Sequence, residues 1–338
     1  MNVADIVDAA IEAPILTSFT KIGPAVRSRV DEWTPLDDYS LDGRTVVITG
    51  STSGLGRHAA ERLAGLGATV VVNGRDPERT ERARADIAEC TSRDDVLAVA
   101  GDLGERDDVE RMAEELTARV GTVDVLIHNA GALSAERSTN RAGIEATIAS
   151  QVLGPFLLTA RLLPGLRSSS QGRVITVSSG GMYTAPLTVE RLQMDPASYG
   201  GSEQYARAKR AQVTLNEMWA EREPAVAFQA MHPGWADTPG VRQSLPRFRT
   251  VLGPLLRDPE QGADTIVWLA ADDRALRSSG SFWLDRRPRP IHKLPTTRRS
   301  DTPERRARLW EWCVEQTGAV VDADPANGDD GPDDGADR

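Results

Sequence analysis

Cysteine is scarce in this chain of 338 residues, which contains only Cys90 and Cys313. The two residues lie far apart and outside any metal-type spacing, so neither a disulfide framework nor a zinc site is expected. We therefore predict no metal site. So few thiols are typical of a protein from a reducing compartment, and we expect a cytoplasmic protein.

Lysine and long apolar runs are scarce too. Lysine occurs only at Lys21, Lys209 and Lys293, and the formal net charge is -10. Nucleic acids attract basic surfaces, so a nucleic-acid partner is not expected. No apolar run approaches the ~20 residues that span a bilayer, and the N-terminus has no basic segment ahead of an apolar one. The sequence predicts no transmembrane segment.

Apolar, β-branched runs alternate with helix-like segments from Arg44 onward. The predicted strands are residues 45–49, 69–72, 96–100, 123–128, 173–177, 225–231 and 281–284. Helical patterns occupy residues 57–66, 77–89, 107–120 and 143–163 and the segment around Tyr205. This alternation predicts an α/β fold of the Rossmann type, with a doubly wound, mostly parallel sheet of seven strands and helices on both faces.

Two segments flank the predicted single domain, which we place at residues 41–320. Residues 321–338, rich in Asp and Gly, are predicted as a disordered acidic tail, and residues 1–40 as a helical extension. We favour packing of this extension on the domain, because an interfacial helix usually carries Lys and Arg on its polar face and this one carries Asp5, Asp8 and Glu12. Peripheral contact with a membrane stays open as the alternative. The apolar residues at helical spacing are Val3, Ile6, Val7, Ala10, Ile11, Ile15, Leu16, Phe19 and Ile22.

A glycine-rich turn follows the first predicted strand and opens a helix. It reads Thr49-Gly50-Ser51-Thr52-Ser53-Gly54-Leu55-Gly56. Glycine lets the chain turn with a positive φ and lets backbone N–H groups approach a pyrophosphate, whose charge the helix N-terminus favours. The turn therefore predicts a dinucleotide site that includes Gly50, Ser51, Ser53, Gly54, Leu55 and Gly56.

Tyr205 and Lys209 stand four residues apart, so on a helix the phenol and the ammonium face the same way. Together with the glycine spacing Gly-X-X-X-Gly-X-Gly, the order of motifs resembles the short-chain dehydrogenase/reductase superfamily over residues 41–284. The longer connections look like its retinol dehydrogenase branch, and most like the dehydrogenase/reductase member 12 group. The other motifs that carry the resemblance are Asp102-Leu103, Asn129-Ala130-Gly131, Ser179 and Pro233-Gly234.

The resemblance implies an NAD(P)-dependent oxidoreductase that interconverts an alcohol and its carbonyl by hydride transfer. Tyr205 would act as general acid and base, and Ser179 would hydrogen-bond the substrate oxygen. Lys209 would hold the nicotinamide ribose and supply the positive charge that makes a phenol useful at neutral pH. Gln151 stands where relatives have Asn; being one methylene longer, it would shift or weaken a water relay behind Lys209. Gln151 is the one feature that favours a second interpretation, a dinucleotide-binding regulator with little turnover.

The same resemblance implies the contacts of the cofactor. Asp102 would bind the adenine amino group and Leu103 would donate its backbone N–H. Asn129-Ala130-Gly131 would pass the adenosine ribose and brace the central strands, while Pro233-Gly234 and Thr238 would lie at the nicotinamide. The alternatives are that Asp102 caps the following helix and that the other two segments are plain turns.

The end of the second strand decides between NAD(H) and NADP(H). An acidic residue there binds the ribose 2′-hydroxyl, whereas an Arg accommodates a 2′-phosphate. Asn73 occupies the expected acidic position, and Arg75 follows two residues later. We therefore favour NADP(H). Asp76 keeps NAD(H) open, although it is better placed to cap the helix that begins at Pro77.

Two loops, near residues 180–203 and 235–256, are predicted to form the substrate side. Their apolar residues suggest a small lipophilic alcohol or carbonyl as substrate, with packing on the core as the alternative. Relatives commonly pair through the long helix and the Tyr205 helix, so the resemblance also implies a homodimer. The apolar residues are Met182, Tyr183, Leu187, Leu192 and Met194 in the first loop, and Leu245, Phe248, Val251, Leu252, Leu255 and Leu256 in the second.

Overall fold

The computed structural model describes residues 3–244 and 246–321, with their side chains outside residues 243–248. Within them, eight strands form one sheet in the order β3-β2-β1-β4-β5-β6-β7-β8. Neighbouring strands from β1 to β7 are parallel, and β8 pairs antiparallel with β7. The strands are β1 (Thr45–Ile48), β2 (Thr69–Gly74), β3 (Val96–Ala100), β4 (Val125–His128), β5 (Arg173–Val177), β6 (Ala227–Met231), β7 (Phe282–Leu284) and β8 (Arg287–Pro288).

The predicted doubly wound α/β fold is confirmed, but the count of seven strands is wrong. Asp285 and Arg286 adopt positive φ angles of 52° and 56° and turn the chain back, so the short strand β8 lies beside β7. A two-residue strand of Arg and Pro has no apolar alternation by which the sequence could reveal it.

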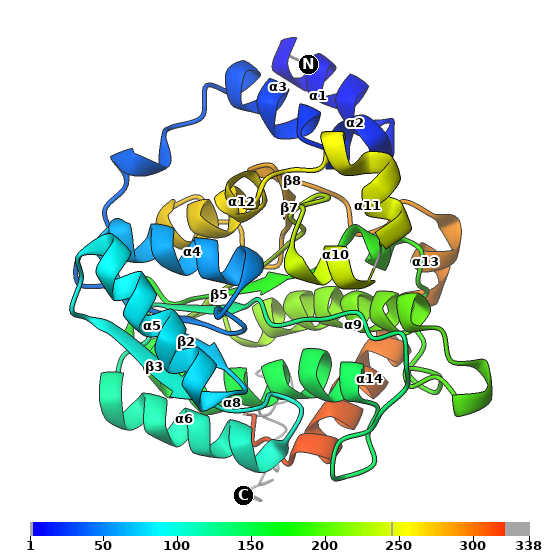
Figure 1. The fold of residues 1–338 in the computed structure, drawn as a ribbon. Helices are drawn as coiled ribbons and strands as arrows, with labels where there is room; N and C mark the ends of the chain where they lie inside the picture. Colours follow the sequence, from blue (N-terminus) through cyan, green and yellow to red (C-terminus); the bar gives the residue numbers. More distant parts are fainter. Residues whose placement is uncertain (1–2, 245, 322–338) are drawn as a thin grey trace, which may run out of the picture.

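Helices cover both faces of the sheet (Figure 1). Val46 and Val70 pack toward one group of helices and Val47 and Val71 toward the other, because successive strand residues point to opposite faces. Both faces are therefore dry, as the apolar strands predicted. The first group is α4 (Gly54–Gly65), α5 (Pro77–Thr91) and α12 (Pro259–Ala271), and the second is α6 (Arg106–Val120), α8 (Gly154–Ser168), α9 (Gly201–Arg222) and α14 (Pro303–Thr317).

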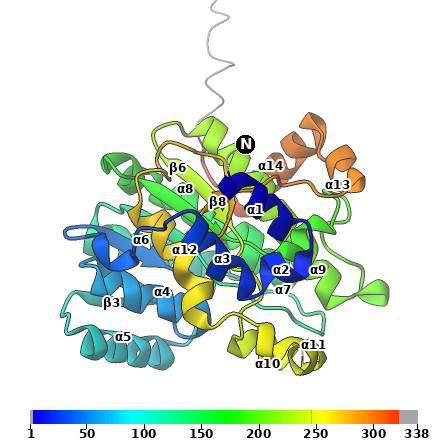
Figure 2. The same cartoon turned by 90° about the horizontal axis from the view of Figure 1, so that it is seen from above.

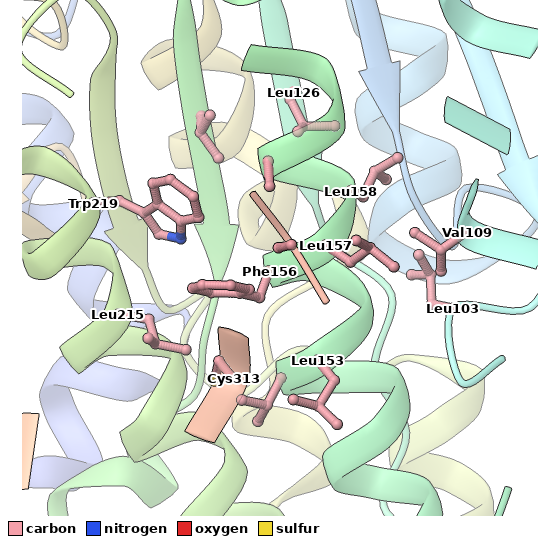
Figure 3. Close-up of a cluster of buried hydrophobic side chains, with 14 of the residues drawn as sticks. Leu103, Val109, Leu126, Leu153, Phe156, Leu157, Leu158, Leu215, Trp219 and Cys313 are labelled. Carbon is pink, nitrogen blue, oxygen red and sulfur yellow. The ribbon is translucent and has the colours of Figure 1, made fainter. Parts of the chain in front are cut away.

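The C-terminal helix α14 covers the pair α8 and α9. The ring of Phe156 lies 5.0 Å from those of both Trp219 and Trp310, centroid to centroid, and Figure 3 shows Phe156, Trp219 and Cys313 in one apolar cluster. The resemblance implied pairing of two chains through α8 and α9. Pairing through this face would require α14 to move aside.

The long helix predicted at 143–163 begins three residues later and changes its winding. It runs from α7 (Ala146–Ile148) through the π-helical turn η2 (Ala149–Leu153) into α8. Among the described residues, it is the one helix whose length and composition would allow it to cross a membrane. Since 83% of its most apolar stretch is buried inside the fold, it is the core helix of the second face.

The N-terminal extension forms α1 (Val3–Glu12), α2 (Ile15–Phe19) and α3 (Ile22–Val30), which lie together at the top of Figure 1 and nearest the viewer in Figure 2. In α1, Asp8 and Glu12 face the domain and accept hydrogen bonds from Arg289 and Lys293. Its apolar side is exposed instead, with Val3 at 76% exposure. The extension therefore packs on the domain, as we favoured, and α1 does so through its charged side.

The other helical segments are short. They are η1 (Leu36–Asp38), η3 (Gly180–Tyr183), η4 (Pro196–Ser198), α10 (Pro239–Ser244), α11 (Pro246–Leu252), η5 (Gly253–Leu255) and α13 (Pro295–Ser300). The predicted tail, apart from its first residue, lies outside the described residues.

Candidate active site

The loops that follow β1 and β4 lie side by side where the sheet changes direction. The chain runs from β1 outward to β3 and returns to β4 on the other side of β1, and such sheets bind ligands at this switch point. Gly50 and Gly54 adopt φ angles of 64° and 59°, and α4 starts at Gly54. The side chain of its N-cap, Ser53, accepts no hydrogen bond from the helix, so the first N–H groups stay available to an anion.

The glycine loop leaves space for a dinucleotide, because larger residues in place of its glycines would fill that space. A Cβ on Gly56 would lie 2.3 Å from Nδ2 of Asn129, whereas a Cβ on Gly54 would meet only Thr238 and Pro239, at 3.8 and 3.7 Å. The predicted phosphate loop thus faces the segment predicted to hold the nicotinamide. Leu55, the remaining predicted loop residue, packs its side chain against Gly262 of α12.

Asn129 joins the two loops. Its Nδ2 donates to the carbonyl oxygens of Thr49 at 2.9 Å and Gly50 at 3.1 Å, and its backbone N–H donates to Oγ1 of Thr49 at 3.0 Å. Ala130 packs against Gly50, where a Cβ would lie 2.7 Å from the Cα of Ala130. These contacts are the bracing that we predicted for the Asn-Ala-Gly segment.

Asp102 shapes the turn after β3. Its Oδ1 accepts the N–H of Gly104 at 2.8 Å, while α6 begins later with Glu105 as N-cap. The alternative that Asp102 caps this helix is therefore wrong. Leu103 beside it is buried against α8, where Gly154 leaves room for the Leu103 carbonyl.

Asn73 is held inside the fold at the end of β2, so it is not free to bind a ribose as we expected of this position. Its side chain is buried, with Nδ2 donating to the Val99 carbonyl at 3.0 Å and Oδ1 accepting the Gly50 N–H of the glycine loop at 3.4 Å. The next residue, Gly74, faces the glycine loop, because a Cβ there would lie 2.5 Å from Cγ2 of Thr52. Arg75 is exposed just beyond it. A side chain at Gly74 would therefore collide with Thr52 and with Oγ1 of Thr80, 2.8 Å from such a Cβ.

Two neighbouring residues serve the structure. The Ser51 hydroxyl, predicted at the cofactor, is buried; it donates to the Ile48 carbonyl at 2.8 Å and accepts from the Asn73 N–H at 3.0 Å. Asp76 caps α5, as predicted, by accepting the N–H of Arg79 at 2.8 Å.

Ser179, Tyr205 and Lys209 meet at the carboxyl end of β5. Ser179 follows this strand, its Oγ accepts the Gly181 N–H at 3.2 Å, and its hydroxyl lies close enough to Tyr205 of α9 to lower the pKa of the phenol. Nζ of Lys209 donates to the Val177 carbonyl at 3.0 Å and lies 5.3 Å from the centroid of the Tyr205 ring. Ser178 donates to the Lys209 carbonyl at 3.2 Å, so the first serine of the pair is structural and the second is at the site.

Burial dominates the ionisation of both groups. It raises the pKa of Tyr205 to about 12, against the opposing effect of the Ser179 hydrogen bond, and it lowers the pKa of Lys209 to about 7. Lys209 is therefore a weaker cation at neutral pH than the sequence argument assumed. The phenol is held protonated and is ready to donate a proton to a ligand oxygen.

Gln151 lies in the π-helical turn, next to Lys209. Its Nε2 donates to the Ala132 carbonyl at 2.7 Å. A Cβ on Gly131 would lie 3.0 Å from Oε1 of Gln151 and 3.2 Å from Nζ of Lys209, so the amide and the ammonium border the same glycine. A cavity of about 30 Å³ extends behind the amide, which is room enough for water. Its polar lining is His128, Gln151, Thr159, Thr176, Gln212 and Asn216.

The first predicted substrate loop packs on the core. Met182, Tyr183, Leu187, Leu192 and Met194 are all buried, and the first four belong to the same clusters as the helices and strands beneath them. The prediction that they line a pocket is wrong for this loop, because apolar residues in a long connection gain more from contact with the core than from exposure.

The second loop is divided. Leu256 is buried and Val251 is 76% exposed, with Leu252 and Leu255 between these extremes. The side chains of Leu245 and Phe248 lie outside the described residues.

Sequence reasoning missed the part that the extension plays at this site. Phe19 of α2 contacts Gly180, directly after Ser179, and its carbonyl accepts the N–H of Trp235 at 2.7 Å. Arg257 donates to the Pro233 carbonyl at 3.1 Å and binds the buried Asp285. The helical spacing of Phe19 was the one available signal, and it could not show which surface the ring would meet.

Comparison with known proteins agrees with this geometry. The sequence matches the short chain dehydrogenase family over residues 44–247. The chain belongs to this family. It is 39% identical over 305 residues to dehydrogenase/reductase SDR family member 12 of Bos taurus, covering 90% of this chain and 95% of the relative. It is 31% identical over 312 residues to retinol dehydrogenase 12 of Bos taurus, covering 90% of this chain and 97% of that protein.

A crystal structure of a Mycobacterium paratuberculosis protein shares the fold, with a TM-score of 0.67 and 28% identity over 85% of this chain and 98% of that one. Together with the retinol dehydrogenase relatives, family membership makes this short-chain dehydrogenase/reductase an NAD(P)(H)-dependent oxidoreductase of alcohol and carbonyl groups.

Proposed function

We propose that this short-chain dehydrogenase/reductase uses NADP(H) to interconvert a lipophilic alcohol and its carbonyl, with Tyr205 as the general acid and base. The observation that carries the proposal is the meeting of Ser179, Tyr205 and Lys209, with Lys209 beside Gly131 in the loop that braces the glycine loop. When bound, the nicotinamide supplies or accepts the hydride.

The residues of the chain handle the proton. In the reducing direction the Tyr205 hydroxyl donates its proton to the carbonyl oxygen, and the Ser179 hydroxyl stabilises the charge that develops on that oxygen. Lys209, when protonated, favours the phenolate that remains. In the oxidising direction the phenolate takes the proton back from the alcohol.

The end of β2 supports the preference for NADP(H). Gly74 leaves no room for the acidic side chain that would bind a ribose 2′-hydroxyl, and Arg75 stands exposed beside it, free to swing toward a 2′-phosphate. Asp76 is engaged as the cap of α5, which removes the main argument for NAD(H).

Consumption of NADPH and NADH with apolar aldehydes and ketones tests the proposal, with Tyr205→Phe as the control. We expect turnover with NADPH that falls by about 10²-fold or more in Tyr205→Phe, while NADPH binding, followed by fluorescence, persists. Nucleotide binding without turnover of any carbonyl would favour the regulator interpretation instead.

The outer side of the extension supports contact with a lipid surface as the source of the substrate. Ile6, Ile15 and Leu16 are 53%, 52% and 45% exposed, although aliphatic side chains of this size normally pack inside. Because the net charge of -10 disfavours anionic lipid, the expected surface is neutral. Flotation with phosphatidylcholine vesicles tests this contact: association of the native chain should be lost in a triple Ile6→Asp, Ile15→Asp, Leu16→Asp variant, and equal association of both would contradict it.

A further inference from the structure

One aromatic side chain of the N-terminal extension reaches the loop that carries Ser179. Phe19, the last residue of α2, is only 4% exposed. A Cβ on Gly180 would lie 2.5 Å from Cε2 of Phe19, so the ring rests directly on the peptide that follows Ser179. The backbone of the predicted substrate-binding serine is thus held from outside by a residue that precedes the domain.

The same residue holds the loop that follows β6. Its ring meets His232 edge-on at 4.4 Å and Trp235 at 5.6 Å, centroid to centroid. Its carbonyl oxygen accepts the Trp235 N–H at 2.7 Å. His232 and Trp235 flank Pro233-Gly234, the segment expected at the nicotinamide. Phe19 therefore joins the serine side and the nicotinamide side of the site.

A buried ionic cluster fixes the position of this segment. Asp285, in the turn between β7 and β8, binds Arg27 of α3 at 2.6 Å and Arg257 at 2.6 and 2.9 Å. The side chains of all three are at most 2% exposed. Arg257 also donates to the carbonyls of Ser18 and Phe19, at 2.8 and 3.1 Å.

The cluster leaves the extension little freedom to shift. Charged groups buried this deeply tolerate no loss of a partner, so α2 and α3 cannot move without breaking several hydrogen bonds. Gly234 adds a steric fit, because a Cβ there would lie 2.2 Å from Nε of Arg257 and 2.7 Å from the Phe19 carbonyl oxygen. A helix that merely covered the surface would need neither this cluster nor such close approach.

From these contacts we infer that Phe19 is a positioning residue of the active site, and that the extension supports the site from outside. The ring sets the place of the Ser179 hydroxyl relative to Tyr205, and the Phe19 carbonyl sets the turn at Pro233-Gly234. This inference rests on the proposed function, because the cost of misplacing Ser179 appears in turnover.

The test compares Phe19→Ala and Phe19→Leu with Phe228→Leu in the full chain. Phe228 is a matched control, because it is a buried Phe that stacks on Trp219 in the core. In Phe19→Ala we expect kcat for carbonyl reduction to fall by about tenfold or more, with the Kd for NADPH nearly unchanged. Phe19→Leu, which keeps apolar volume against Gly180, should restore part of kcat and serves if the alanine variant fails to fold.

Hydrogen exchange separates this inference from the proposed function. If Phe19 positions the site, exchange of residues 178–183 and 232–236 should rise in Phe19→Ala and not in Phe228→Leu, whether or not a substrate has been found. Native kcat and unchanged exchange in Phe19→Ala, with a loss of Tm like that of Phe228→Leu, would reduce Phe19 to an ordinary core residue and overturn the inference. Absence of turnover in the native chain would instead count against the proposed function.

Discussion

Replacing Asp285 by Asn should be among the most destabilising isosteric changes in this chain. The carboxylate accepts three hydrogen bonds from two guanidinium groups, two at 2.6 Å and one at 2.9 Å, with its side chain 2% exposed. Asn keeps the shape and tolerates the φ of 52° at this position, so backbone strain does not confuse the result. The substitution removes the charge and replaces one acceptor oxygen by an amide donor.

The expected loss of unfolding free energy follows from the partners that Arg27 and Arg257 retain. Arg27 retains Asp8 and Glu12 as partners, at 2.7 and 2.9 Å, whereas Arg257 retains only the carbonyls of Ser18, Phe19 and Pro233. One buried cation is thus left without an anion, a change that costs about 3–5 kcal/mol of the free energy of unfolding. The sum of three charge-assisted bonds would be larger, but Asn still accepts one of them.

Urea unfolding followed by tryptophan fluorescence measures this loss, and Asp37→Asn is the matched control. Asp37 binds Arg62 at 2.7 Å, but its side chain is 78% exposed, so its loss should cost less than about 1 kcal/mol. Similar small losses in both variants, with unchanged m-values, would refute the claim that the Arg27-Asp285-Arg257 cluster anchors the extension.

Three further outcomes follow from the site and the core. Arg75→Glu should raise the KM for NADPH by about tenfold or more and leave the KM for NADH nearly unchanged. The control Arg79→Glu, on the exposed side of α5, should change neither value. Equal effects of Arg75→Glu on both cofactors would show that Arg75 does not bind the 2′-phosphate. Because burial raises the pKa of Tyr205 to about 12, kcat/KM for alcohol oxidation should still be rising at about pH 10, and a plateau at neutral pH would show that the cofactor or Lys209 lowers this pKa. Trp310→Ala should cost about 3–5 kcal/mol of unfolding free energy, measured in urea, and a negligible loss would show that α14 is dispensable for α8 and α9.

The sheet and the reacting centre were predictable because short segments of the sequence specify both. Strands buried on both faces must be apolar and β-branched, and all seven predicted strands begin and end within two residues of the observed ones. The glycine turn and the pair Tyr205 and Lys209 act through local geometry, a turn before a helix and two side chains on one helical face. Such local geometry depends little on the tertiary contacts around it.

Contacts between distant segments were not predictable in the same way. The orientation of Asn73 depends on its side-chain hydrogen bond to Val99 of β3, 26 residues away. The apolar residues of the loop after Ser179 pack on the core. The side of α1 that faces the domain could not be predicted either. Its charged side faces inward because Asp8 and Glu12 bind Arg27, Arg289 and Lys293. No local pattern shows where these three basic residues gather.

The sequence by itself determined the α/β fold and the glycine loop through periodicity and spacing, and its motifs carried the resemblance that points to Ser179, Tyr205 and Lys209. Only the tertiary structure decided that burial leaves Tyr205 protonated and Lys209 weakly basic. It also decided that Phe19 rests on Gly180, 161 residues further along the chain. Both depend on which surfaces exclude water and touch, and that is fixed by the packing of the whole chain rather than by any segment of it.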